Sequence, residues 1–236
     1  MHDFSLNYSK KKSFFLLFHF TLGFFVIYPM ILFFLLAILG IDSWIYDGKA
    51  DMFYSIIMLI SSIFFTKELL WRSISELAEN PGKVFKTIVT TLPMMLLGSI
   101  VLNYLITTFT GQMEAQNQTE IIDLFNKTPY LIVIQALLYA PIVEEIMFRG
   151  LVFGGLSKKS MSFAIIISSS LFGLAHISNS LMSGNFADLW FFPTYALLGY
   201  FLNRAYIKSG SIVSSMALHF LNNAIGLLAI SAIGLF

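Results

Sequence analysis

The chain has 236 residues, of which 57% are hydrophobic and 11% are charged, and its formal net charge is +1. Soluble domains carry about 25% charged residues, so this composition indicates an integral membrane protein without a separate soluble domain. A net charge near zero argues against a nucleic-acid partner. Because the chain contains no cysteine, disulfides, a cysteine nucleophile and thiolate metal sites are excluded.

The apolar segments predict an all-α fold, a polytopic transmembrane helical bundle of about seven spans within a range of six to eight. The first segment follows Lys10, Lys11 and Lys12 and is longer than the apolar region of a signal peptide. We therefore interpret it as an uncleaved span, with Pro29 as a candidate kink. The expected spans are residues 13–41, 52–66, 84–110, 129–153, 161–178, 187–203 and 211–236.

The connections differ in character. Residues 42–51 predict an acidic loop, and residues 67–86 predict a short interfacial helix that ends in a turn at Asn80-Pro81-Gly82. Residues 111–128 form the longest polar connection, and residues 157–160 form a basic turn. A cytoplasmic N-terminus leaves only Lys49 and Lys127 of the 14 Lys and Arg residues outside, as the positive-inside rule expects.

Three charged residues interrupt the fourth apolar segment: Glu144, Glu145 and Arg149. A charge at the centre of a bilayer costs at least ~2.5–3.5 kcal/mol, so such residues are paired, face a polar cavity or have a function. Glu145 and Arg149 are four positions apart on one helix face and predict a structural ion pair. Glu144 has no local partner, which makes it a candidate functional carboxylate.

Two later segments carry polar residues at similar depth, His176 in one and His219 with Asn223 in the other. At ~1.5 Å per helical residue, all of them and Glu144 lie within the ~30 Å hydrocarbon core. A desolvated Glu beside an imidazole can act as general base on a water molecule, while His219 and Asn223 can donate hydrogen bonds to an oxyanion. Each of these residues could instead be structural. The two histidines, Asn222 and Asn223 could form interhelical hydrogen bonds, and Glu144 could be a second structural carboxylate.

The motifs Glu144-Glu145-x-x-x-Arg149, Phe172-x-x-x-His176 and His219-x-x-x-Asn223 together resemble the signature of the CPBP family. These are the CAAX protease and bacteriocin-processing (Abi) intramembrane proteases. The resemblance implies that Glu144 and His176 activate water, that His219 and Asn223 form the oxyanion site, and that Glu145 and Arg149 hold the helix. Phe172 would pack beneath the site.

The resemblance also divides the chain into an N-terminal three-span region without signature, residues 1–128, and a catalytic core, residues 129–236. The sequence leaves open whether the site binds a metal ion. Glu144, His176 and His219 could ligate Zn²⁺ with one open position, and the same residues can work without metal. Our expectation leans toward no tightly bound metal.

The favoured hypothesis is an intramembrane endopeptidase that cleaves a membrane-associated peptide or protein within the lipid bilayer. By resemblance to bacterial members, it would lie in a bacterial plasma membrane and serve bacteriocin self-immunity or peptide-signal maturation. One alternative is a non-catalytic membrane scaffold or regulator that retains the CPBP fold. Another is a proton-coupled transporter with Glu144 and His176 as relays, although the chain shows no inverted repeat.

Overall fold

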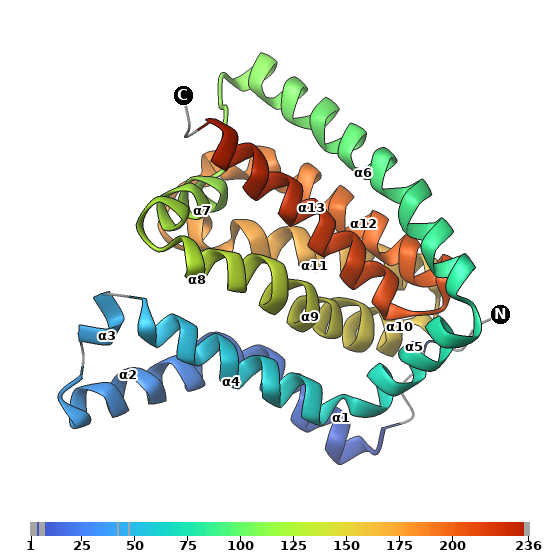
Figure 1. Cartoon of the computed structure of the whole chain (residues 1–236), viewed down its shortest axis with the longest axis horizontal. Helices are drawn as coiled ribbons and strands as arrows, with labels where there is room; N and C mark the ends of the chain where they lie inside the picture. The colour runs from blue at the N-terminus through green and yellow to red at the C-terminus, as the bar shows by residue number, and fades with distance from the viewer. Residues whose placement is uncertain (1–3, 5–7, 42, 47, 234–236) are drawn as a thin grey trace.

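The computed structural model describes residues 4, 8–41, 43–46 and 48–233, and all regular secondary structure in these residues is helical. Long apolar segments favour helices because only a helix satisfies its own backbone hydrogen bonds in lipid. Figure 1 shows α6 to α13 packed side by side, with α1 to α4 running along one side of them. The predicted all-α polytopic fold is confirmed.

The N-terminal part is a pair of long helical segments followed by a third span. The polar stretch 67–86 contains the expected short helix, which a break at Asn80 separates from the next span. The irregular point in the first span is a π-helical segment that ends just before Pro29. The elements are α1 (Lys10–Phe18), π-helical η1 (His19–Ile27), α2 (Tyr28–Leu39), α3 (Ser43–Tyr46), α4 (Lys49–Phe65), α5 (Lys67–Glu79) and α6 (Pro81–Thr110).

The C-terminal part holds all three motifs. The polar connection 111–128 contains an amphipathic helix. The elements are α7 (Gln116–Lys127), α8 (Pro129–Ile134), π-helical η2 (Gln135–Tyr139), α9 (Ala140–Glu145), π-helical η3 (Ile146–Phe153), α10 (Gly154–Ser157), α11 (Met161–Met182), 3₁₀-helical η4 (Phe186–Phe191), α12 (Phe192–Ser209) and α13 (Ile212–Ile233).

The number of spans follows from helix length and apolarity. Five helical stretches among the described residues are long and apolar enough to cross a membrane, and the pair α4–α5, bent by 75°, makes a sixth if it counts as one span. The remaining expected span corresponds to α12, which is absent from that set. Its last two turns carry Asn203, Arg204 and Lys208, which lower its apolarity.

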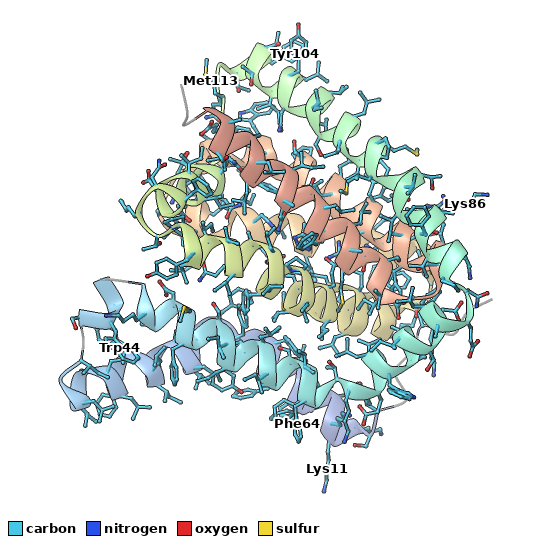
Figure 2. The ribbon with its side chains drawn as sticks, in the orientation of Figure 1. Lys11, Trp44, Phe64, Lys86, Tyr104 and Met113 are labelled. Atoms are coloured by element: carbon cyan, nitrogen blue, oxygen red, sulfur yellow. The ribbon has the colours of Figure 1, made fainter. Side chains whose placement is uncertain are left out.

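The side chains place the molecule in a membrane. Phe34 of α2 and Phe109 of α6 are among many large apolar residues exposed on its outside, a surface that lipid would cover. Figure 2 shows Lys11 and Lys86 at one end of the bundle and Trp44 and Met113 at the other. The chain is thus an integral, multi-pass membrane protein with basic residues gathered toward one end.

Helices α11 and α12 pack most closely, and a glycine makes this possible. A Cβ on Gly199 would lie 3.0 Å from Cα of Ser169 and 3.2 Å from Cβ of Phe172. Any larger residue would therefore push the two backbones apart. The close approach also leaves the Gly199 carbonyl within reach of Arg149, whose side chain enters the same interface.

Candidate active site

The charged stretch lies on α9 and η3, deep inside the bundle. Glu145 and Arg149 are fully buried, and Nη1 of Arg149 lies 3.1 Å from Oε1 of Glu145. The guanidinium also donates from Nη2 to the Gly199 carbonyl at 3.0 Å. This ion pair therefore fixes the α9–η3 segment against α12. A buried charge needs both a counter-charge and hydrogen bonds, and Arg149 receives both here.

Glu145 has a second partner that comes from a distant helix. Nδ1 of His219, on α13, lies 2.9 Å from the same Oε1 of Glu145. Because a carboxylate can only accept, the imidazole donates its Nδ1–H, and Nε2 carries the free lone pair of the neutral ring. The Glu145 carboxylate thus orients His219 as well as neutralising Arg149.

Glu144 and His176 face each other across the site. Nε2 of His176 lies 4.0 Å from Oε2 of Glu144, an oxygen that is buried and has no hydrogen-bond partner in the described part of the chain. Nδ1 of His176 is 2.9 Å from the Phe172 carbonyl and donates to it, so Nε2 is an acceptor in the neutral ring. Two acceptors at this separation leave a position for a water molecule that donates to both.

Aromatic rings hold His176 in this orientation. Its ring stacks on Tyr195 of α12, with centroids 4.8 Å apart and an interplanar angle of 26°. Phe172 lies on its other flank at 4.4 Å and makes an edge contact with His219 at 5.8 Å. Phe172 therefore packs between the two histidines. Nothing in the sequence pattern singled out Tyr195, which lies outside the three motifs.

Asn223 contacts a π-helical segment. Its Nδ2 donates to the Ala136 carbonyl of η2 at 2.9 Å, and its Oδ1 accepts from Nδ2 of Asn222 at 3.3 Å. The Ala136 carbonyl is free to accept this bond because the N–H of Ala140 donates to the Gln135 carbonyl in the π-turn and Pro141 has no N–H. One N–H of the Asn223 amide remains for another acceptor.

These side chains surround one cavity of about 380 Å³. Glu145 and Arg149 lie behind its wall, and the other five predicted site residues line it. The sequence reasoning missed three further groups: Tyr195, the inner face of α7, and the buried carboxylate of Asp188 that holds α7 in place. The only sequence signal for α7 was the polar character of residues 111–128, and Tyr195 and Asp188 had none. The lining residues with polar or aromatic groups nearest the motifs are Glu144, Phe172, His176, Tyr195, His219, Asn222 and Asn223.

Glu144, His176 and His219 are the candidate ligands for a metal ion. Within the described ranges, no group of three His, Cys, Asp or Glu side chains is arranged to hold a metal ion. The Nδ1 of His219 is engaged by Glu145, and the Nδ1 of His176 by Phe172. Both Nε2 atoms therefore keep a free lone pair, so the chemistry of these side chains is compatible with a metal, although Glu144, His176 and His219 are not gathered into a three-ligand group among the described residues. The steps below are derived for the chain's own residues.

The fold defines a class, the polytopic helical membrane proteins, and this member carries a buried cluster of Glu and His side chains. The match with a family model agrees. Residues 126–225 match the model described as type II CAAX prenyl endopeptidase Rce1-like. This confirms the resemblance that the three motifs indicated, and the matched segment runs from the end of α7 through all three motifs in α9–η3, α11 and α13.

Two curated relatives are similar to part of this chain. The "Putative membrane peptidase YdiL" of Bacillus subtilis is 31% identical over 111 residues, which cover 47% of this chain and 41% of the relative. The "UPF0177 protein YxdF" of Lactococcus lactis is 30% identical over 96 residues, which cover 41% of this chain and 48% of the relative. The matched region spans less than half of each relative. No solved structure matches the chain.

Proposed function

We propose that the protein is an intramembrane endopeptidase in which Glu144 and His176 share the attacking water. The observation that carries the proposal is the 4.0 Å gap between Oε2 of Glu144 and Nε2 of His176, two acceptors without a direct bond. The Rce1-like match over residues 126–225 and the name of the Bacillus subtilis relative support it. Residues 129–236 would be the catalytic core, with residues 1–128 packed beside it.

Hydrolysis then proceeds by general base catalysis. The water oxygen attacks the carbonyl carbon of the scissile peptide bond while Glu144 takes a proton from the water. The resulting oxyanion accepts the free N–H of Asn223, and His219 lines the same cavity with its ring oriented by Glu145. The C–N bond then breaks, the proton on Glu144 passes to the leaving amine, and the second water proton stays on the new carboxylic acid, which then ionises to a carboxylate by releasing this proton to the amine or to solvent.

The composition of the cavity supports water as the nucleophile. Within the described part of the chain, the cavity lining contains no Ser, Thr, Cys or Lys side chain, the usual covalent nucleophiles. A carboxylate with an unpartnered buried oxygen is available instead. The glutamate type of mechanism is therefore the one we propose.

We propose the cellular location and role from the positions of basic residues and from the two curated relatives. Because Lys11 and Lys86 lie at the same end of the bundle, where α1 begins, we propose that this end faces the cytoplasm. The two bacterial relatives point to a bacterial plasma membrane. The substrate would be a membrane-associated peptide or protein, cleaved in bacteriocin self-immunity or in the maturation of a peptide signal.

The test is cleavage of a peptide library by the purified full chain in nanodiscs, with products identified by mass spectrometry. Wild-type protein should cleave defined bonds, and Glu144→Gln should remove all of these cleavages while its melting temperature is kept. Cleavage that persists in Glu144→Gln would come from a contaminant or another residue. A library that wild-type protein leaves intact would favour the non-catalytic scaffold.

A further inference from the structure

The amphipathic helix α7 forms one wall of the active-site cavity. Asn117, Gln118, Glu120, Ile121 and Leu124 all line it, although none belongs to the three motifs. In Figure 1, α7 lies beside α8 and α11 at the end of the bundle away from the N-terminus. A substrate in the cavity would therefore contact α7 as well as the catalytic residues.

The position of α7 is fixed by a carboxylate from another segment. Asp188 of η4 is buried, and its Oδ2 accepts the backbone N–H of Gln116 at 2.8 Å and the hydroxyl of Ser180 on α11. Since no side chain of α7's own N-terminal region caps the helix, Asp188 takes this role from across the fold. Asn117 adds a contact from Nδ2 to the Tyr195 hydroxyl at 3.5 Å. The residues of α7 that line the cavity are thus held at a defined place.

The charged side chains that line the cavity are all acidic. Its lining contains two carboxylates, Glu120 and Glu144, and no Lys or Arg among the described residues. Arg149 lies behind the wall and is already paired with Glu145. One oxygen of Glu120 accepts a hydrogen bond from Nε2 of Gln116 at 2.8 Å, a neutral partner that leaves its charge uncompensated. A largely apolar cavity with two uncompensated carboxylates attracts a cation and disfavours an anion.

We propose that Glu120 makes the site selective for substrates with a cationic side chain, Lys or Arg, close to the scissile bond. The inference rests on the proposed hydrolysis at Glu144. In this arrangement Glu144 is reserved for the water, whereas Glu120, on the α7 wall, binds the ammonium or guanidinium group of the substrate. The same charges reject substrates with an acidic residue at that position.

The experiment compares three apolar peptides that differ at one position scanned along the sequence, which holds Lys, norleucine or Glu. Binding is measured by fluorescence anisotropy with the full chain in nanodiscs, and cleavage is followed in parallel. The Lys peptide should bind about ten-fold more tightly than the norleucine peptide at its best position, and the Glu peptide should bind most weakly. Glu120→Gln should reduce the Lys preference to about two-fold, and Glu120→Lys should reverse it.

Asp123→Asn is the matched control, because Asp123 is an exposed carboxylate of the same helix that does not line the cavity. It should leave the preference unchanged. Equal binding of all three peptides, a preference that Glu120→Gln leaves intact, or no binding at all would overturn the inference. Lys-selective binding without cleavage would contradict the proposed hydrolysis alone, and cleavage without charge preference would contradict only the role of Glu120.

Discussion

The Nδ1 nitrogen of His219 lies 2.9 Å from Oε1 of Glu145, a residue 74 positions earlier in the chain. The same oxygen receives the Arg149 guanidinium at 3.1 Å. One carboxylate therefore links three functions: it neutralises a buried cation, it joins α13 to α9, and it sets the orientation of the histidine beside the cavity. This relationship makes Glu145 more than a partner within its own helix.

Replacement of Glu145 by Gln should destabilise the fold. The amide keeps the shape and can still accept a hydrogen bond, but Arg149 is left as an uncompensated buried charge, which costs about 3–5 kcal/mol. Thermal unfolding in nanodiscs measures the loss. The double variant Glu145→Gln/Arg149→Met should recover much of the lost stability, since it removes the orphaned charge. A double variant as unstable as the single one would contradict this reading.

Asn223→Ala should lower catalysis and stability separately. Loss of the oxyanion donor should reduce kcat by roughly 10²–10³-fold with little change in KM. Loss of the bond to the Ala136 carbonyl should cost about 1 kcal/mol, as interhelical hydrogen bonds do in membranes. Steady-state kinetics and melting curves of the same preparation separate the two effects. If only the melting temperature falls, Asn223 is an anchor and not an oxyanion donor.

Gly199→Ala should loosen the α11–α12 interface. The added methyl group would meet the Ser169 backbone at 3.0 Å, where no flexible side chain can move aside. We expect a loss of about 1–3 kcal/mol, as for other overpacked interiors. Gly155→Ala is the control, because a Cβ there meets nothing within 4 Å. Equal melting temperatures for the two variants would show that the interface is not tightly packed at Gly199.

Removal of metal ions should leave cleavage unchanged. The proposed mechanism activates the water with Glu144 and His176 alone, and the described side chains form no group of three potential ligands. Activity is compared before and after dialysis against a chelator, with the metal content of the protein measured in each sample. A loss of activity that Zn²⁺ restores would contradict this expectation and would require the site to rearrange around the ion.

The sequence was most informative about charged side chains, because burying a charge in a membrane costs free energy. Glu144 was predicted to be a functional carboxylate because no residue one turn away could pair with it. In the structure, its Oε2 has no hydrogen-bond partner among the described residues. The long apolar helices followed from apolarity, whereas the bounds of α12 and the amphipathic helix α7 did not. The spacing of Glu145 and Arg149 was enough to predict their ion pair, since i,i+4 contacts are local.

What escaped prediction depends on the tertiary arrangement. The bond between His219 and Glu145 joins distant helices, and the Asn223 contact needs a carbonyl freed by the π-helical segment η2. The stacking of Tyr195 on His176 has no signature in the sequence. The stretch 111–128 was polar enough to be interpreted as a connection, and only its packing beside α8 and α11 gives α7 a place at the site.

The shared water is tested most directly by a double-mutant cycle on Glu144 and His176. The kcat/KM of wild type, Glu144→Gln, His176→Gln and the double variant is measured with one sensitive fluorogenic substrate, with folding checked by melting temperature. Each single variant should lose roughly 10²–10⁴-fold, and the double variant should lose no more than the worse single one, because both residues act on the same molecule. A double variant whose loss equals the product of the two single losses would show that the residues act independently, and would contradict the shared water.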